Sequence, residues 1–148
     1  MGLRRAGREL ALKALYRMDI VGDRSLREAQ ELIAQVPADQ RARLFAMELV
    51  GGVLAEMDYL DQLLTQVVTN WSLTRLSRID HNILRLAGFE LLRRADIPAR
   101  ATMDEAVELA KRYGDHGSSQ FVNGVIDVMA ERMGVKHKGD DNLAALKD

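Results

Sequence analysis

The sequence contains no cysteine, only two prolines and few aromatic residues. Without thiols, the chain can form neither a disulfide nor a thiolate metal site. No apolar run approaches the roughly 18 residues that a membrane-spanning helix needs, and the opening Met-Gly-Leu-Arg-Arg lacks the apolar stretch of a signal peptide. We therefore expect a cytoplasmic protein without membrane contact, and nothing in the sequence indicates a cofactor.

The length and charge narrow the class of protein further. A chain of 148 residues suits one globular domain with a substantial core. The formal net charge is −1, so the protein is not basic overall. Any polyanionic partner would have to bind a local basic patch.

Hydrophobic periodicity predicts an all-α fold of about seven helices and no strand. Apolar residues recur at steps of three and four, as at Leu26, Ala29 and Ile33. Two further segments are expected near 39–55 and 58–69, with Gly51-Gly52 as a weak point in the first. A helix over about 76–94 is apolar over a broad arc, which places it at the centre of the bundle. Glu90 falls within that arc and needs a hydrogen-bonding partner or a raised pKa, in a structural rather than a functional role.

Helix boundaries are predicted from capping patterns. Thr102 to Glu105 has the T-x-x-E spacing of a capping box, which would open a helix. Gly114 would close that helix, and Ser118 or Ser119 would open the next one. Residues 1–134 are predicted to form the helical domain. Residues 135–148 are polar and are expected to form a flexible tail.

The first predicted helix combines basic residues with one exposed aromatic ring. Its apolar face runs from Leu10 to Met18, and Tyr16 points nearly opposite, among cations. Such a ring could stack on an unpaired base while the cations bind phosphates. The structural alternative is a solvated basic helix end whose tyrosine packs on a neighbour. The stretch 1–17 has one acid, Glu9, against five basic residues: Arg4, Arg5, Arg8, Lys13 and Arg17.

The last predicted helix supplies a second candidate surface. Phe121 lies about a quarter turn from the apolar stripe, at the edge of burial. The free amides and hydroxyls at Gly117, Ser118 and Ser119 could receive a phosphate, as helix starts commonly do. The alternative is that Phe121 is a core residue and the serines are helix caps.

Enzymatic sites are not indicated. The three histidines, His81, His116 and His137, lack metal-ligand spacing, so no metal site is predicted. Ser118 lies too close in sequence to His116 and Asp115 for a nucleophile arrangement. We therefore expect no catalytic residues.

Several segments together resemble the bacterial transcription antitermination factor family NusB. They are the opening RRAGRELALKALY, the central RIDHNILRLAGFELL, and DIP followed by DEAVELAKRYG and SSQFVNGVIDVMA. The resemblance extends to about Arg132, although residues 19–50 match only in helical pattern.

The resemblance implies a fold of two small helical bundles and no enzymatic activity. Members of this family bind the boxA element of leader RNAs, including those of ribosomal RNA operons, together with the ribosomal protein NusE. That complex joins RNA polymerase and other Nus factors and suppresses premature, Rho-dependent termination. The family's basic amino end falls on Arg4, Arg5 and Arg8, and its RNA-contacting positions fall on Ser118 and Phe121. Asp80 aligns with a NusE-facing position, and its neighbours Arg78 and His81 are further partner-surface candidates.

The chain also departs from the family pattern. Arg4-Arg5 is followed by Ala6 and Gly7 where some relatives have a third arginine, so the helix is expected to start only near Arg8. Gly117 stands where some relatives have an acidic residue, and the loss of that negative charge beside a phosphate path should favour RNA binding.

Two alternative classes remain open. One is a homodimeric or purely protein-binding adaptor whose basic helix is occluded. The other is the NusB-like domain of a ribosomal RNA cytosine methyltransferase, although this chain ends before a cofactor-binding domain could fit. The preferred RNA sequence is not indicated.

Overall fold

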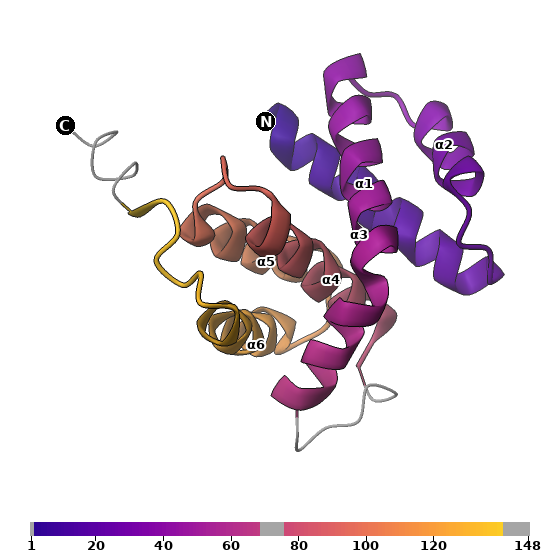
Figure 1. Cartoon of the computed structure of the whole chain (residues 1–148). Helices are drawn as coiled ribbons and strands as arrows, with labels where there is room; N and C mark the ends of the chain where they lie inside the picture. The colour runs from indigo at the N-terminus through magenta and orange to yellow at the C-terminus, as the bar shows by residue number, and fades with distance from the viewer. Residues whose placement is uncertain (1, 69–75, 141–148) are drawn as a thin grey trace. The chain divides into compact units, whose positions relative to one another are not determined.

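The computed structural model describes residues 2–68 and 76–140, and within these ranges it contains six α-helices and no strand. The all-α prediction is therefore confirmed (Figure 1). Within these ranges, no helix combines the length and apolar character needed to cross a membrane. The helices are α1 (Leu3–Val21), α2 (Leu26–Gln35), α3 (Gln40–Val67), α4 (Arg78–Arg93), α5 (Ala99–Tyr113) and α6 (Ser118–Met133).

The chain divides into two compact units, residues 1–57 and residues 58–148. In the first unit, α1 packs against α2, and the first part of α3 completes the unit. In the second unit, α4, α5 and α6 pack against one another pairwise. The two units agree in number with the two small bundles that the family resemblance implies.

The helix α3 is longer than predicted. Two segments, near 39–55 and 58–69, were expected, but the helix continues from Gln40 to Val67 through Gly51 and Gly52. Buried apolar residues follow one another at helical spacing on both sides of the glycines, including Val50, Val53 and Leu60. Their burial outweighs the ~1 kcal/mol that a glycine costs inside a helix.

Two serines cap helix starts, and the predicted capping box at Thr102 is wrong. Ser25 Oγ accepts from the Glu28 amide, and Ser77 Oγ accepts from the Asp80 amide. The helix α5 instead begins at Ala99, directly after Pro98, whose extended backbone serves as the N-cap. Thr102 is therefore already inside the helix, and its amide donates to the Pro98 carbonyl.

The Thr102 side chain contributes to the core instead. Its Oγ1 donates to Glu90 Oε1 across 3.2 Å, and both residues are buried. Glu90 was predicted to need such a partner on the apolar arc of α4, and that prediction is confirmed. The bond joins α4 to α5, because a buried carboxylate is stable only where its oxygens accept hydrogen bonds.

The first residues of the predicted tail are packed. Lys138 Nζ donates to the carbonyls of Glu90 at 2.9 Å, Leu91 at 3.4 Å and Arg94 at 2.8 Å, which lie at the carboxyl end of α4. Helix ends leave such carbonyls without intrahelical partners, and a cation there also complements the helix dipole. Residues 135–140 thus differ from the flexible tail that was predicted for 135–148. Residues 141–148 lie outside the described ranges.

Replacing Thr102 with valine should destabilise the second unit by about 1–3 kcal/mol, because a buried carboxylate oxygen loses a donor while the side-chain shape is kept. Urea unfolding of the Thr102→Val variant measures this cost. Thr102→Ser keeps the hydroxyl and is the control. Equal stability of the valine variant and the parent would show that the bond contributes nothing.

Candidate nucleic-acid interface

The basic residues of α1 differ in exposure. Arg4, Lys13 and Tyr16 are exposed, and Tyr16 retains 39% of its accessible surface. Arg5 is partly exposed. Arg8, however, is only 5% exposed, so its guanidinium is not a surface group. The first unit thus has exposed cations around an exposed tyrosine, as predicted, but the side chain of Arg8 is buried beneath them.

Phe45 of α3 holds two of these arginines, and sequence reasoning missed it. The guanidinium carbon of Arg4 lies 6.0 Å from the centroid of the Phe45 ring, and that of Arg8 lies 5.8 Å from it. A cation over an aromatic face gains about 0.5–1 kcal/mol at exposed sites. The spacing of Arg4 and Arg8, one helical turn apart, indicates a shared face, but the sequence does not indicate which distant ring lies there.

Gly7 allows this close approach of α1 and α3. A Cβ atom at Gly7 would lie 2.6 Å from Phe45 Cδ2 and 3.0 Å from the Ala42 carbonyl oxygen. The helix was expected to begin only near Arg8, but it begins at Leu3 and runs through Gly7. Packing against Phe45 offsets the low helix propensity of glycine at this position.

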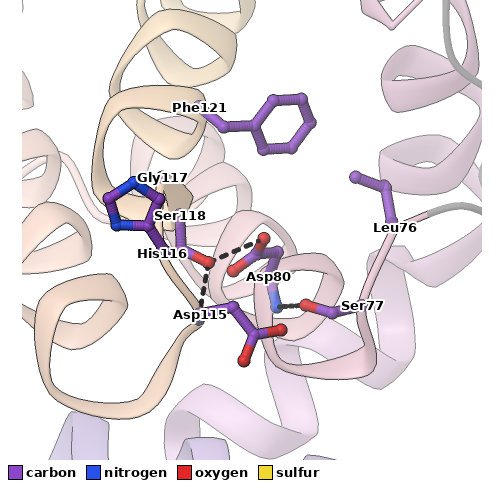
Figure 2. A pocket seen from close by; sticks show the side chains of 8 residues that line it. All are labelled: Leu76, Ser77, Asp80, Asp115, His116, Gly117, Ser118 and Phe121. Carbon is purple, nitrogen blue, oxygen red and sulfur yellow. Dashed lines mark hydrogen bonds between the residues drawn. The ribbon is translucent and has the colours of Figure 1, made fainter.

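In the second unit, a pocket of about 360 Å³ lies where α4 and α6 begin. Figure 2 shows the ring of Phe121 and the side chain of Leu76 on either side of the space, with Asp80 below them. Asp115 and His116 also line it, and both are exposed. The predicted residues Ser118 and Phe121 are thus brought together with Asp80, which had been assigned to a partner surface.

Ser118 is the central hydrogen-bonding residue beside the pocket. Its Oγ donates to Asp80 Oδ2 at 3.1 Å and accepts from the Asp115 amide at 2.9 Å. Gly117, with φ of 87°, is the N-cap of α6, so Ser118 opens the helix without capping it. Because Ser118 is only 4% exposed and its hydroxyl is engaged, it shapes the pocket rather than presenting its hydroxyl to a ligand.

Asp80 is buried with one oxygen uncompensated. It is 9% exposed, and its Oδ1 has no hydrogen-bond partner within the part of the chain that the structure describes. Burial raises the pKa of the Asp80 carboxyl, and the charge of Asp115 raises it further, against the lowering effect of the hydrogen bonds from Ser118 and Ser77. The carboxylate is therefore held at a cost in desolvation energy.

The two carboxylates determine what the pocket can accept. Helix starts attract anions, but Asp80 already places a negative charge at the first turns of α4 and α6. A phosphate beside Asp80 and Asp115 would be repelled, so the phosphate site considered at Gly117–Ser119 is not favoured. An aromatic wall with hydrogen-bond acceptors suits a nucleobase better.

The other two residues predicted to face NusE, Arg78 and His81, differ in their surroundings. Arg78 is exposed. His81 Nε2 lies 2.8 Å from Asp61 Oδ1, and Arg85 donates to both oxygens of Asp61. Burial alone would raise the pKa of Asp61, but the hydrogen bonds from His81 and Arg85 outweigh it and hold that pKa well below its usual range. His81 thus takes part in joining α3 to α4. Within the described residues, no group of His, Asp and Glu side chains is arranged to hold a metal ion.

Gly7→Ala should destabilise the first unit by about 1–3 kcal/mol, because the added methyl group meets Phe45 and a backbone carbonyl that cannot move aside. Gly124→Ala is the matched control, since a Cβ at Gly124 meets nothing within 4 Å. Thermal unfolding compares the two variants. A stable Gly7→Ala protein would mean that the contact with Phe45 is loose.

Asp61→Asn and Asp80→Asn should change stability in opposite directions at pH 7. The pKa of Asp61 is depressed by folding, so its contribution is present above about pH 3.8 and is lost as the pH falls. The pKa of Asp80 is raised, so its contribution is full below about pH 3.8 and is lost as the pH rises through the folded pKa.

Asp61→Asn should therefore lower the unfolding temperature at pH 7, and Asp80→Asn, which keeps an acceptor for Ser118, should raise it. The Asp80 difference should vanish toward pH 3.5, whereas the Asp61 difference should persist there and shrink only at lower pH, as a pH series of melts would reveal. Shifts of the same sign at pH 7 would contradict the assigned environments.

Comparison with known proteins accords with the helical architecture. The NusB family model matches residues 5–131. The transcription antitermination protein NusB of Sorangium cellulosum (strain So ce56) is 42% identical over 134 residues, covering 90% of this chain and 96% of that protein. The structure of T. maritima NusB aligns with a TM-score of 0.81 and 35% identity, over 95% of this chain and 96% of that one.

A structure of the antitermination factors NusB and NusE in complex with double-stranded RNA also contains a similar chain. It aligns with a TM-score of 0.78 and 25% identity, over 88% of this chain and 97% of that one. The family match spans most of the sequence and includes the helices that carry both candidate surfaces. The chain therefore belongs to the NusB family.

Proposed function

We propose that the protein is a cytoplasmic transcription antitermination factor that binds the boxA RNA of ribosomal RNA operon leaders together with the ribosomal protein NusE. In this role it suppresses premature, Rho-dependent termination and performs no catalytic step. The observation that carries the proposal is the exposed cationic face of α1, with Tyr16 among its cations, in a chain of formal net charge −1. Family membership supports the same function.

The two units would make different contacts with the RNA. On α1, Arg4, Arg5 and Lys13 would neutralise phosphates, and Tyr16 would stack on a base. Arg8 would contribute positive charge without touching the RNA, because it is buried and lies over the same Phe45 ring as Arg4. In the second unit, Phe121 would stack on an unpaired base, and Ser118 would hold the pocket in shape.

NusE and RNA polymerase with other Nus factors are the proposed protein partners. The similar chain in the NusB and NusE complex supports this proposal. Of the three residues first considered for the NusE surface, Arg78 is the best candidate, because it is exposed whereas Asp80 and His81 have partners inside the second unit.

Exposed apolar side chains favour one alternative, a homodimer or protein-binding adaptor that covers the basic helix. Ile20, Leu26 and Leu44 of the first unit are each about half exposed, at 52%, 47% and 58%. Molar mass by light scattering, with and without boxA RNA, tests this alternative. A dimer that persists when RNA is added would favour the adaptor.

The proposed function predicts separate effects of charge and stacking on RNA affinity. Arg4→Gln and Lys13→Gln should each reduce the salt dependence of binding by about 0.7 in log–log slope, because each removes one phosphate contact on a single strand. Phe121→Ala should weaken binding roughly 10-fold with little change in slope, because it removes stacking and not charge. Fluorescence anisotropy of a labelled boxA strand, with and without NusE, measures both.

Arg27→Gln provides the matched charge control. Arg27 is highly exposed on α2, in an ion pair with Glu31, and lies outside the proposed surface. Its replacement should leave the slope unchanged. If boxA and a scrambled strand bind equally well in the presence of NusE, the proposed function is wrong.

A further inference from the structure

The carboxylate of Asp80 has hydrogen-bonding capacity that the fold does not use. An ionised carboxylate can accept about four hydrogen bonds. Within the described residues, Ser118 donates to Oδ2 and Ser77 also lowers the pKa of the carboxyl, whereas Oδ1, which is almost inaccessible, accepts no hydrogen bond. A buried carboxylate that is only partly compensated is costly, and such groups cluster at functional sites.

The surroundings of Asp80 narrow the type of ligand. The carboxylate lies at the base of the pocket, below the Phe121 ring and Leu76, and the oxygen on the side of the ring is Oδ2, which can accept a second hydrogen bond besides that from Ser118 (Figure 2). Those two side chains offer apolar walls to a flat group. Asp80 and Asp115 together disfavour an anion, so the ligand must be planar, uncharged or cationic, and able to donate hydrogen bonds.

We propose that this pocket selects an unpaired base that carries an exocyclic amino group, and that Asp80 accepts a hydrogen bond from that group. The inference rests on the proposed RNA-binding function and adds the base preference of one subsite. Cytosine, adenine and guanine present such an amine on the Watson–Crick edge, and carboxylates accept from the cytosine amine in other nucleic-acid complexes. Uracil presents a carbonyl at the same place, so its oxygen would face the Asp80 carboxylate and be repelled.

Ser118 is the positioning residue for this contact. Its hydroxyl holds Oδ2 of Asp80 and is itself fixed by the Asp115 amide, so the carboxylate cannot rotate freely. Ser77 caps α4 through the Asp80 amide and fixes the backbone of the same residue. The acceptor is therefore ordered before a base enters, which reduces the entropy lost on binding.

The first step of the test locates the base at Phe121. A boxA strand is made with one abasic site at each position in turn, and each version is bound to the full chain with NusE and to Phe121→Ala with NusE. At the position in contact with Phe121, loss of the base should weaken the parent protein but not the variant. If no strand binds selectively, the proposed function fails, and the base preference fails with it. If binding is selective but no position responds, only the base preference fails.

The second step changes only the amine at that position. Cytosine is compared with pyrimidin-2-one, and adenine with purine, because each pair differs by the amino group alone. Loss of the amine should weaken binding about 10-fold, the range of a hydrogen bond to a charged group. Uracil should bind no better than the bases without an amine.

Exchange of the acceptor supplies the decisive variant. Asp80→Asn keeps an oxygen for Ser118 and adds an amide donor, so the preference should reverse toward uracil. Asp115→Asn is the matched control: it removes a charge at the same pocket but keeps the Asp80 carboxylate and its hydrogen bond from Ser118, so it should strengthen all strands alike and leave the ratio of cytosine to uracil unchanged. Thermal melts of both variants exclude misfolding.

Three further results would overturn the inference while leaving the proposed function intact. The first is equal binding of strands with and without the amine at the Phe121 position. The second is an unchanged base preference in Asp80→Asn. The third is a loss of NusE binding in Asp80→Asn with the RNA preference retained, which would assign the carboxylate to a protein side chain.

Discussion

The hydrogen bond between Ser118 and Asp80 is the interaction on which the second candidate surface depends. It joins residues 38 positions apart and ties the first turn of α4 to the first residue of α6. Phe121 lies one turn farther along α6, so the place of its ring follows from this bond. The same bond orders a carboxylate whose burial raises its pKa. The proposed base contact would therefore oppose stability at this residue, since the buried carboxylate costs desolvation energy.

The candidate surface of the first unit depends on a different kind of contact. There the guanidinium groups of Arg4 and Arg8 lie over the Phe45 ring, and the absence of a side chain at Gly7 lets α1 approach that ring. A cation over an aromatic face keeps its full positive charge, so such a contact is compatible with attraction for phosphate. The two units thus offer complementary chemistry to a nucleic acid, with cations in one and hydrogen-bond acceptors beside an aromatic ring in the other.

Local patterns in the sequence predicted the parts of the structure that local forces decide. The apolar stripe of α1, the central place of α4 and the need of Glu90 for a partner all followed from helical periodicity. Thr102 was misassigned because the capping pattern is short, and Pro98 had already set the helix start four residues earlier. The length of α3 was underestimated because burial, which the sequence shows only indirectly, outweighed its two glycines.

The details of the candidate site were less predictable because they are long-range. Phe121 and Ser118 were proposed from the sequence, but the contact of Ser118 with Asp80 depends on how α4 packs against α6. The resemblance to a family indicated Asp80 as a surface residue, and its burial changes that interpretation. Phe45 carried no local pattern at all, since its role arises only when α3 meets α1.

The packing of Lys138 against the carboxyl end of α4 restricts how the sequence after α6 can vary. Lys138 reaches three carbonyls from a short segment that begins where α6 ends at Gly134, and Gly139 beside it packs on Pro98. Connecting segments usually tolerate insertions and deletions well. Here a change of even one residue between Gly134 and Lys138 would shift the ammonium group out of register with the helix end, whereas substitutions at constant length would leave it in place. This segment is therefore constrained in length more strongly than in composition.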